Sequence, residues 1–385
     1  MPLSGSEMTD VPERGPARAA RSGRGGGWLT RAWMNPRLHA AVARLPGLGR
    51  IARSEGAVMF GLVGGFVNSQ ILLALAELGV LDALVAGPQS AAALARPAGL
   101  AEDRMAILLQ GGAALRLLKR RRDGRFSLTR RGAVLLGVPG LVGMIRHHAV
   151  FYRDLTDPVA LLRGGTETEL ARFWPYVFGA GGATDPQVTA TYSTLMSDTQ
   201  GLVAEDTLRC ADLSGVTRLL DVGGGTGAFL AAAGARYPAL DLALFDLPAV
   251  VGPARARFAA AGMADRVTIL PGSFRDDPIP TGADAISLVR VLYDHADDTV
   301  INLLAAVYAA LPKGGRLIIS EPMSGGNLPD AITDTYFAFY TLAMGTGRTR
   351  SAARIAELVT AAGFDQVTIR PGPRPYITGL VLARK

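Results

Sequence analysis

Residues 219–230 read LLDVGGGTGAFL, an apolar strand pattern that runs into a glycine-rich turn and then into a helical pattern. The glycines at 223, 225 and 227 allow a sharp turn and let a ligand approach the backbone without side chains in the way. A strand, a glycine loop and a helix in this order predict the first unit of an α/β sheet that binds a nucleotide-like ligand.

From this unit to the C-terminus, short apolar strand patterns alternate with amphipathic helical patterns. The expected strands are 217–222, 241–246, 266–270, 283–289 and 315–320, and the expected helices lie near 227–236, 248–261, 297–311 and 351–362. This alternation predicts a parallel sheet wrapped by helices, with ligands at the carboxyl ends of the strands. Two final apolar runs, 365–370 and 376–383, predict a hairpin that completes the sheet.

The glycine loop alone does not identify its ligand. Gly223, Gly225 and Ala228 also match the dinucleotide fingerprint, with Asp246 near the expected ribose position. Asp221, just before the loop, would repel a pyrophosphate but suits a ligand that carries an ammonium and a sulfonium group. The sequence therefore predicts S-adenosylmethionine rather than NAD, with Asp246 accepting hydrogen bonds from both ribose hydroxyls.

Length and composition set the broad class of the protein. A chain of 385 residues exceeds the usual size of one core, so we expect two domains with a connecting helical segment. The single cysteine, Cys210, excludes an internal disulfide framework and a cysteine-based zinc site, which favours the cytoplasm. No metal is expected, since His147 and His148 have no third ligand at a fitting spacing.

The net charge of +7 is unevenly distributed along the chain. Residues 1–53 hold nine arginines against three acids, and residues 116–131 hold eight basic residues against Asp123, so the rest of the chain carries a net −6. A basic arm and a basic hairpin on an acidic body fit nucleic acid or the anionic face of a membrane as partner. A solvated arm and a charged turn explain the same pattern.

The N-terminal third of the chain contains a basic arm and helical patterns. Residues 1–30 are rich in Gly, Arg, Pro and Ser and are predicted to be disordered, without a secretory signal. Residues 57–76 carry no charge and are long enough to span a bilayer, but polar residues 68–70 favour a helix buried in the protein or in a dimer interface. Three helical patterns within 70–118 and an Asp-Gly turn at 123–124 predict a winged-helix module, which leaves a DNA-binding regulator as an alternative.

Taken together, these motifs resemble a known enzyme family. The glycine loop, FDLP at 245–248, PGSF at 271–274, RVLYD at 290–294 and GRTR at 347–350 are similar to class I small-molecule O-methyltransferases with an N-terminal winged-helix dimerisation domain. GFVNSQILLA (65–74), RVLYDH (290–295) and DTYFAFYTLAMGTGR (334–348) resemble the carotenoid branch from purple phototrophic bacteria, the hydroxyneurosporene or demethylspheroidene O-methyltransferases. The resemblance extends from about residue 35 to the end.

The resemblance implies a domain plan and a cofactor site. The plan is a basic arm (1–30), a winged-helix dimerisation domain (31–145), a helical linker that contributes to the substrate pocket (146–212) and a Rossmann-like methyltransferase domain (213–385). It implies a homodimer and no nucleic-acid partner. The cofactor-binding residues that it implies are Asp221, Gly223, Gly225, Gly227, Asp246, Leu247, Ser273, Phe274 and Arg290.

The stretch RVLYDH departs from the family pattern at the catalytic position. Many relatives have Leu-His-Asp-Trp here, where the histidine takes the proton from a phenol; in this chain Tyr293 stands at that position, Asp294 matches, and His295 replaces the tryptophan. Gly347 replaces the glutamate that orients the histidine in relatives. We expect Tyr293, Asp294 and His295 to form an altered catalytic site, with Tyr293 either passing a proton or only shaping the pocket.

Loss of the histidine base argues against phenols as acceptors. The resemblance implies transfer to the tertiary C-1 hydroxyl of an acyclic carotenoid, with another hydrophobic pigment or natural product, methylated at oxygen or carbon, as the alternative. Such a hydrophobic substrate fits a cytoplasmic enzyme that contacts the inner or photosynthetic membrane through its basic segments. The residues expected to line the substrate pocket are His148, Tyr152, Trp174, Tyr192, Met196, Phe337, Tyr340 and Met344.

Overall fold

The computed structural model describes residues 27–45, 47–173 and 186–385, without the side chains of Leu29, Phe173 and residues 186–197. The chain divides into two units, 1–69 and 70–385. In the first unit, α1 (Gly27–Trp33) begins inside the segment 1–30 that was expected to be disordered, so at least its last four residues are helical. Helix α2 (Pro36–Arg44) follows, with the Asn35 side chain accepting a hydrogen bond from the Arg37 N–H at its start.

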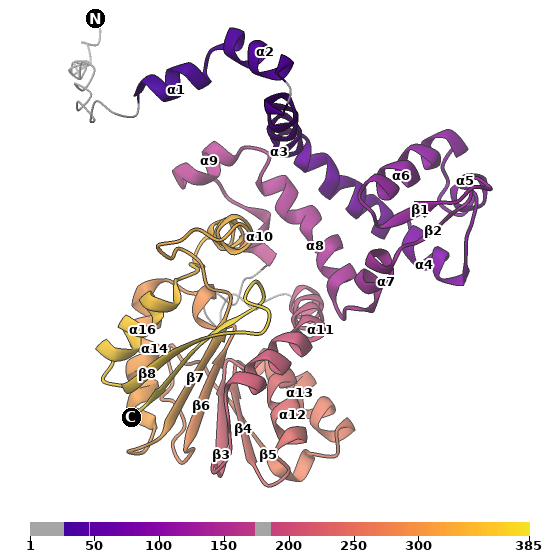
Figure 1. Cartoon of the computed structure of the whole chain (residues 1–385). Helices are drawn as coiled ribbons and strands as arrows, with labels where there is room; N and C mark the ends of the chain where they lie inside the picture. The colour runs from indigo at the N-terminus through magenta and orange to yellow at the C-terminus, as the bar shows by residue number, and fades with distance from the viewer. Residues whose placement is uncertain (1–26, 46, 174–185) are drawn as a thin grey trace, which may run out of the picture. The chain divides into compact units, whose positions relative to one another are not determined.

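The C-terminal part of the second unit is built on a seven-stranded sheet in the order β5-β4-β3-β6-β7-β9-β8 (Figure 1). The strands are β3 (Arg218–Val222), β4 (Asp241–Asp246), β5 (Val267–Pro271), β6 (Ala285–Val289), β7 (Arg316–Glu321), β8 (Asp365–Pro371) and β9 (Gly379–Arg384). The first five run parallel. Strand β9 pairs antiparallel with β7, and β8 pairs antiparallel with β9 at the edge of the sheet. The predicted parallel sheet and its closing hairpin are confirmed.

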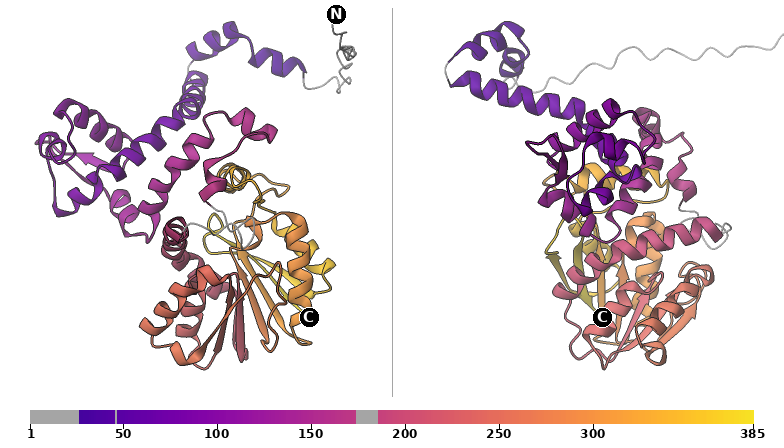
Figure 2. Two further views of the ribbon diagram at one scale, coloured as in Figure 1. Left: turned by 180° about the vertical axis from the view of Figure 1, so that it is seen from behind. Right: turned by 90° about the vertical axis from the view of Figure 1, so that its right-hand side faces the viewer.

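Helices cover both faces of this sheet, as Figure 2 shows from two sides. One face packs against α14 (Asp297–Ala310) and α16 (Ala352–Ala361), and the other against α11 (Pro186–Cys210), α12 (Ala228–Arg236) and α13 (Pro248–Ala260). The central strands β3 and β6 have almost no exposed side chains, which explains why their sequences are continuous apolar runs rather than alternating ones.

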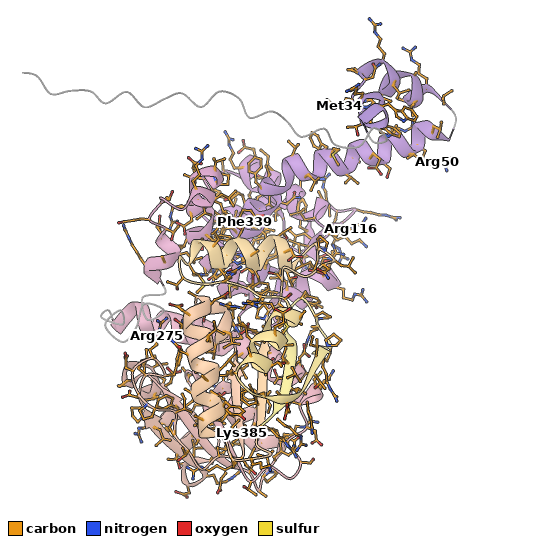
Figure 3. The ribbon with its side chains drawn as sticks, turned by 90° about the vertical axis from the view of Figure 1, so that its left-hand side faces the viewer. Met34, Arg50, Arg116, Arg275, Phe339 and Lys385 are labelled. Carbon is orange, nitrogen blue, oxygen red and sulfur yellow. The ribbon has the colours of Figure 1, made fainter. Side chains whose placement is uncertain are left out.

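The register of the parallel strands brings the ends of β3, β4 and β5 to one edge of the sheet. Val222 pairs with Phe245, and Asp246 pairs with Pro271, so the glycine loop and the segments after β4 and β5 emerge side by side. Figure 3 shows Arg275, just after β5, towards this edge and Lys385 at the opposite edge. The predicted ligand position at the carboxyl ends therefore exists as a cluster of loops.

The predicted winged helix is present at 78–137. Its elements are α4 (Val80–Ala83), a 3₁₀ turn (Leu84–Ala86), α5 (Ala91–Ala95), α6 (Glu102–Ala114), the hairpin strands β1 (Leu118–Arg120) and β2 (Phe126–Leu128), and α7 (Arg130–Gly137). The hairpin turns at Asp123, whose carboxylate accepts a hydrogen bond from the Arg125 N–H. The helical pattern expected to be continuous over 71–84 is interrupted, because Gly79 adopts a left-handed φ of 63° between α3 and α4.

Helix α3 (Leu48–Glu77) contains the uncharged stretch 57–76. Its first part is not buried within this chain, since Phe60, Val63 and Phe66 are 78%, 75% and 71% exposed, whereas Leu75 and Ala76 at its end are buried. It is long and apolar enough to cross a membrane by length and composition alone. The expectation of burial inside the protein is therefore confirmed only for the end of the stretch, which packs in the winged-helix core, and for the exposed part the dimer interface remains the prediction.

Between the winged helix and the sheet, three helices lead towards the site: α8 (Leu141–Asp154), α9 (Pro158–Arg163) and α10 (Glu169–Phe173). Helix α8 packs on α15 (Ala338–Ala343), which continues a π-helical turn at Thr333–Phe337. Phe151, Leu170, Tyr340 and Met344 share a buried cluster there. This packing brings side chains from the first half of the chain next to the segment that follows β7.

Candidate active site

Asp246 ties together the two loops that form the floor of the site. Its carboxylate accepts hydrogen bonds from the Gly225 N–H at 2.6 Å and from the Leu247 N–H at 2.7 Å. Burial raises the pKa of Asp246 to about 6, although both backbone donors work in the opposite direction. The carboxylate is therefore held at the end of β4, as predicted for a group that accepts hydroxyl donors.

Asp221 lies beneath the glycine loop and does not line the cavity above it. It is fully buried, and one carboxylate oxygen accepts a hydrogen bond from the Ser287 hydroxyl at 2.6 Å. The other oxygen has no hydrogen-bond partner among the described residues, and the position where Gly224 would carry a Cβ is next to it. Burial raises the pKa of Asp221 to about 7. An unpartnered acidic oxygen under the loop favours a positively charged ligand nearby.

A cavity opens above the loop at the carboxyl ends of the strands. Of the nine predicted cofactor residues, seven line it and Asp221 and Gly227 do not. Gly223 and Gly225 have left-handed φ values of 70° and 60°, and a Cβ on Gly223 would come within 2.9 Å of Val291. The lining residues are Gly223, Gly225, Asp246, Leu247, Val250, Gly272, Ser273, Phe274, Arg275, Arg290, Val291, Asp294 and His295.

The cavity fits S-adenosylmethionine by the chemistry of its walls. Phe274 offers an aromatic face for the adenine, and its ring meets the His295 ring edge-on at 5.2 Å. Asp246 is placed where it would accept hydrogen bonds from ribose hydroxyls, and Asp221 and Asp294 in their ionised form would attract the ammonium and sulfonium groups. Gly227 does not line the cavity but shapes the loop beneath it, because it precedes α12 with a left-handed φ and lies against the Phe258 ring.

Hydrogen bonds to β7 hold the turn that follows β6. Arg290 has a left-handed φ of 59°, and its N–H donates to the Ser320 carbonyl at 2.8 Å. The carboxylate of Glu321, at the end of β7, accepts hydrogen bonds from the N–H groups of Leu292 and Tyr293 at 2.9 and 3.2 Å. Burial raises the pKa of Glu321 to about 7. A non-glycine residue at such a φ is uncommon, and here neighbouring contacts impose it.

Arg350 is a second bracing residue that sequence reasoning did not assign. It is 3% exposed, its guanidinium donates to the carbonyls of Leu292 and His295, and it pairs with Asp297 at 2.6 Å. The sequence signal that could have identified Arg350 is its position as the last residue of the motif GRTR at 347–350. For Glu321, the only signal was an acid at the end of an apolar strand.

The three predicted catalytic residues do not share one hydrogen-bonded chain. Asp294 and His295 face the cofactor cavity, and His295 Nδ1 contacts the Arg275 guanidinium at 3.0 Å. The Tyr293 hydroxyl instead accepts a hydrogen bond from Arg290 at 3.4 Å. Burial raises the pKa of Tyr293 beyond its ordinary value, and that of Asp294 as well, while it lowers the pKa of His295 to about 3.

An aromatic cluster joins α8 to the segment 336–340. His148 Nε2 and the Tyr336 hydroxyl are 2.7 Å apart, and His147 Nε2 and the Tyr340 hydroxyl are also 2.7 Å apart. Burial lowers the pKa of each histidine to about 4, so both rings are neutral at physiological pH.

The residues predicted to line the substrate pocket are placed differently from one another. His148, Tyr152 and Phe337 are half-buried in or beside the aromatic cluster, whereas Tyr340 and Met344 belong to its buried core, 5% and 1% exposed. Trp174 and the side chains of Tyr192 and Met196 lie outside the described residues. Tyr336, which the cluster places at its centre, was not among the predicted residues.

Two family models match this chain. Residues 152–365 match an O-methyltransferase domain, and residues 60–137 match an O-methyltransferase dimerisation domain. The first match covers α9, α10, the cavity and most of the sheet, and the second covers part of α3 and the winged helix.

Individual proteins are similar over nearly the whole chain. A demethylspheroidene O-methyltransferase from Cereibacter sphaeroides is 62% identical over 347 residues, covering 90% of this chain and 92% of that protein. The protein of the same name from Rhodobacter capsulatus is 52% identical over 358 residues, with 93% and 89% covered. The crystal structure of human N-acetylserotonin methyltransferase in complex with SAM has a TM-score of 0.75 at 26% identity, covering 86% of this chain and 97% of that chain.

Proposed function

Because this chain belongs to the O-methyltransferase family, we propose that it transfers a methyl group from S-adenosylmethionine to the tertiary C-1 hydroxyl of an acyclic carotenoid of the demethylspheroidene or hydroxyneurosporene type. The observation that carries this proposal is the high identity to two proteins named for that reaction, over almost their full lengths. Tyr293 at the position of the family's histidine base supports a weakly acidic alcohol as acceptor.

The protein's contribution to this reaction is mainly alignment. When bound, the cofactor supplies a methyl group already activated on a sulfonium. Asp246 and the Ser273–Phe274 loop would hold its nucleoside part, and the acids around the glycine loop would balance its positive charge. The residues of the cavity and the aromatic cluster would then exclude water and hold the acceptor oxygen in line with the methyl group.

Tyr293 is suited to orient the acceptor. Since Arg290 donates to the Tyr293 oxygen, the phenolic hydrogen is available for the acceptor oxygen. Burial keeps this phenol protonated by raising its pKa, so it acts as a neutral donor.

The direct test is incubation of the protein with S-adenosylmethionine labelled in the methyl group and a 1-hydroxylated acyclic carotenoid. We expect label in a methyl ether at C-1, and none with the same carotenoid lacking the hydroxyl. Label bound to carbon, or transfer only to another hydrophobic pigment, would replace this function with the alternative one. No transfer to any hydroxylated carotenoid would contradict the proposal.

Tyr293→Phe should lower kcat roughly tenfold, the effect of losing one orienting hydrogen bond. The affinity for S-adenosylmethionine should stay within about twofold, because the Tyr293 side chain does not line the cofactor cavity. Steady-state kinetics together with calorimetric titration of the cofactor measure both values. An unchanged kcat would reduce Tyr293 to a wall of the pocket.

The exposed apolar side chains of α3 support a homodimer as the working unit. The dimerisation model begins at residue 60, within this helix, and Phe60, Leu62, Val63 and Phe66 are exposed in the single chain. A contiguous apolar surface of this kind needs a partner in water. A second copy of the chain is the partner that the family domain implies.

The basic hairpin supports peripheral contact with an anionic membrane, where a carotenoid substrate is dissolved. Lys119 and the arginines at 120, 121, 122 and 125 are all exposed around the turn. Replacing Arg120, Arg121 and Arg122 by Gln should weaken binding to vesicles with anionic lipid by about 100-fold, at about 1 kcal/mol for each charge.

A matched control for the hairpin variant removes three exposed arginines elsewhere, Arg236, Arg255 and Arg384. It changes the net charge equally and should change vesicle binding by less than about threefold. Equal effects of the two triple variants in vesicle flotation would assign the binding to net charge and contradict a role of the hairpin.

A further inference from the structure

Tyr336 and His148 form a hydrogen-bonded pair in the aromatic cluster, and Tyr336 lies within electrostatic range of Tyr293. Resting on the function proposed above, we propose that this pair is the proton acceptor of the reaction: Tyr336 takes the proton of the acceptor hydroxyl while its own proton passes to His148 Nε2. The pair would replace the histidine base that Tyr293 displaced from the turn after β6.

The two residues come from distant parts of the chain and meet with good geometry. His148 is on α8 and Tyr336 is in the π-helical turn Thr333–Phe337, 188 residues away. The Nε2–Oη distance is 2.7 Å, and the rings meet edge-on at 5.4 Å. A π-helical turn is rare and often marks a functional position, because it displaces a side chain from the place that an α-helix would give it.

The surroundings of the Tyr336 hydroxyl place it on the reaction side of the cluster. Burial raises the pKa of Tyr336, and the next contributions come from Tyr293, Arg290 and Tyr152. Tyr293 and Arg290 belong to the turn that borders the cofactor cavity. Tyr336 therefore lies within electrostatic reach of the residue that is suited to hold the acceptor hydroxyl.

The neighbouring pair, His147 and Tyr340, has the same chemistry but a different environment. His147 is 9% exposed and Tyr340 is 5% exposed, and Tyr340 packs among Phe151, Leu161 and Leu170. This pair serves packing, and it provides an internal control for the other one.

The proposed step balances in atoms and charge. The bond between sulfur and the methyl carbon breaks as the bond from the acceptor oxygen to that carbon forms, and the sulfonium leaves as a neutral thioether. The acceptor O–H proton moves to the Tyr336 oxygen, the Tyr336 proton moves to His148 Nε2, and the positive charge ends on the imidazole.

A neutral imidazole with a low pKa is suited to this task for a weakly acidic alcohol. It cannot remove the proton beforehand, but it can accept one as the ether oxygen becomes positively charged during transfer. Because burial lowers the pKa of His148 to about 4, with His147 as its imidazole neighbour and Tyr152 and Tyr336 beside it, the ring then releases the proton readily. The ring is half-buried, which leaves a route for that proton to water.

The kinetic test compares Tyr336→Phe and His148→Asn on two acceptors. One is a tertiary alcohol with the carotenoid end group, and the other is its more acidic analogue with one methyl replaced by trifluoromethyl. For the plain alcohol we expect kcat to fall about 100-fold with KM within a few-fold, since proton transfer contributes on the order of 10²–10⁴. For the acidic analogue the loss should shrink to about tenfold or less, because less help is needed to remove its proton.

His147→Asn is the matched control, and it should change kcat by less than about threefold on both acceptors. Thermal unfolding and cofactor titration of every variant separate a folding defect from a catalytic one, and His148→Gln serves as a second variant if His148→Asn is unstable. Equal losses on the two acceptors, or an equal loss in His147→Asn, would assign the pair a structural role and overturn the proposal.

A readout without turnover is the protonation state of His148 in the free protein. In protein labelled with ¹⁵N-histidine, the His148 signals are identified by their loss in His148→Asn. We expect a neutral ring at pH 7 with the hydrogen on Nδ1 and Nε2 accepting from Tyr336, and a shifted Nε2 signal in Tyr336→Phe. A hydrogen on Nε2 would overturn the proposal. If the wild type methylates neither alcohol, the proposed substrate fails instead, and this measurement still tests the pair.

Discussion

Asp246→Ala should weaken the binding of S-adenosylmethionine by about 100- to 10,000-fold, because hydrogen bonds to a charged acceptor contribute roughly 1.5–3 kcal/mol each and two ribose hydroxyls lose theirs. The variant also removes the acceptor for the N–H groups of Gly225 and Leu247, so the glycine loop loses its link to the end of β4. Calorimetric titration measures the affinity directly. Asp241→Asn, at the exposed start of the same strand, should leave it unchanged within about twofold.

The same carboxylate predicts how cofactor affinity depends on pH. The pKa of Asp246 in the free protein is raised to about 6, and the ionised form is the one that accepts both hydroxyls and attracts a cationic ligand. Affinity should therefore be full above pH 7 and fall up to tenfold per pH unit below about 6. In Asp246→Asn this decline should be smaller. A wild-type affinity that is constant from pH 5 to 8 would contradict a direct role of this carboxylate.

Arg350→Ala should destabilise the protein by about 3–5 kcal/mol, the cost of breaking a buried ion pair and its hydrogen bonds. The guanidinium is the donor for the Leu292 and His295 carbonyls and the partner of Asp297, so its loss leaves buried acceptors unpaired on both sides of Tyr293. Denaturant unfolding monitors the stability. We also expect a raised KM for both substrates, since the turn borders the cofactor cavity.

The control for this variant is an arginine that faces the same aspartate from the surface. Arg354 is 3.9 Å from Asp297, and its side chain is 48% exposed. Arg354→Ala should cost less than about 1 kcal/mol, as exposed ion pairs usually do. If the two variants were equally stable, the proposed bracing of the turn by Arg350 would be wrong.

Local patterns in the sequence determined the sheet, the winged-helix hairpin and the cofactor loop. Glycines at 223 and 225 followed a buried strand, and Asp246 ended the next one, so neighbouring residues alone indicated their conformations and the edge where they meet. The apolar runs of β3 and β6 likewise predicted burial on both faces. These features depend on short-range periodicity and on the backbone freedom of glycine, which any reader of the chain can see.

Only the tertiary structure decided which way the catalytic stretch faces and what supports it. RVLYDH suggested one Tyr-Asp-His site, yet the Tyr293 hydroxyl bonds to Arg290, whereas Asp294 and His295 line the cofactor cavity. Glu321 and Arg350 hold that turn from other segments. The pairing of Tyr336 with His148 joins residues 188 positions apart. Contacts of this range follow from how whole elements pack, and no local pattern encodes them.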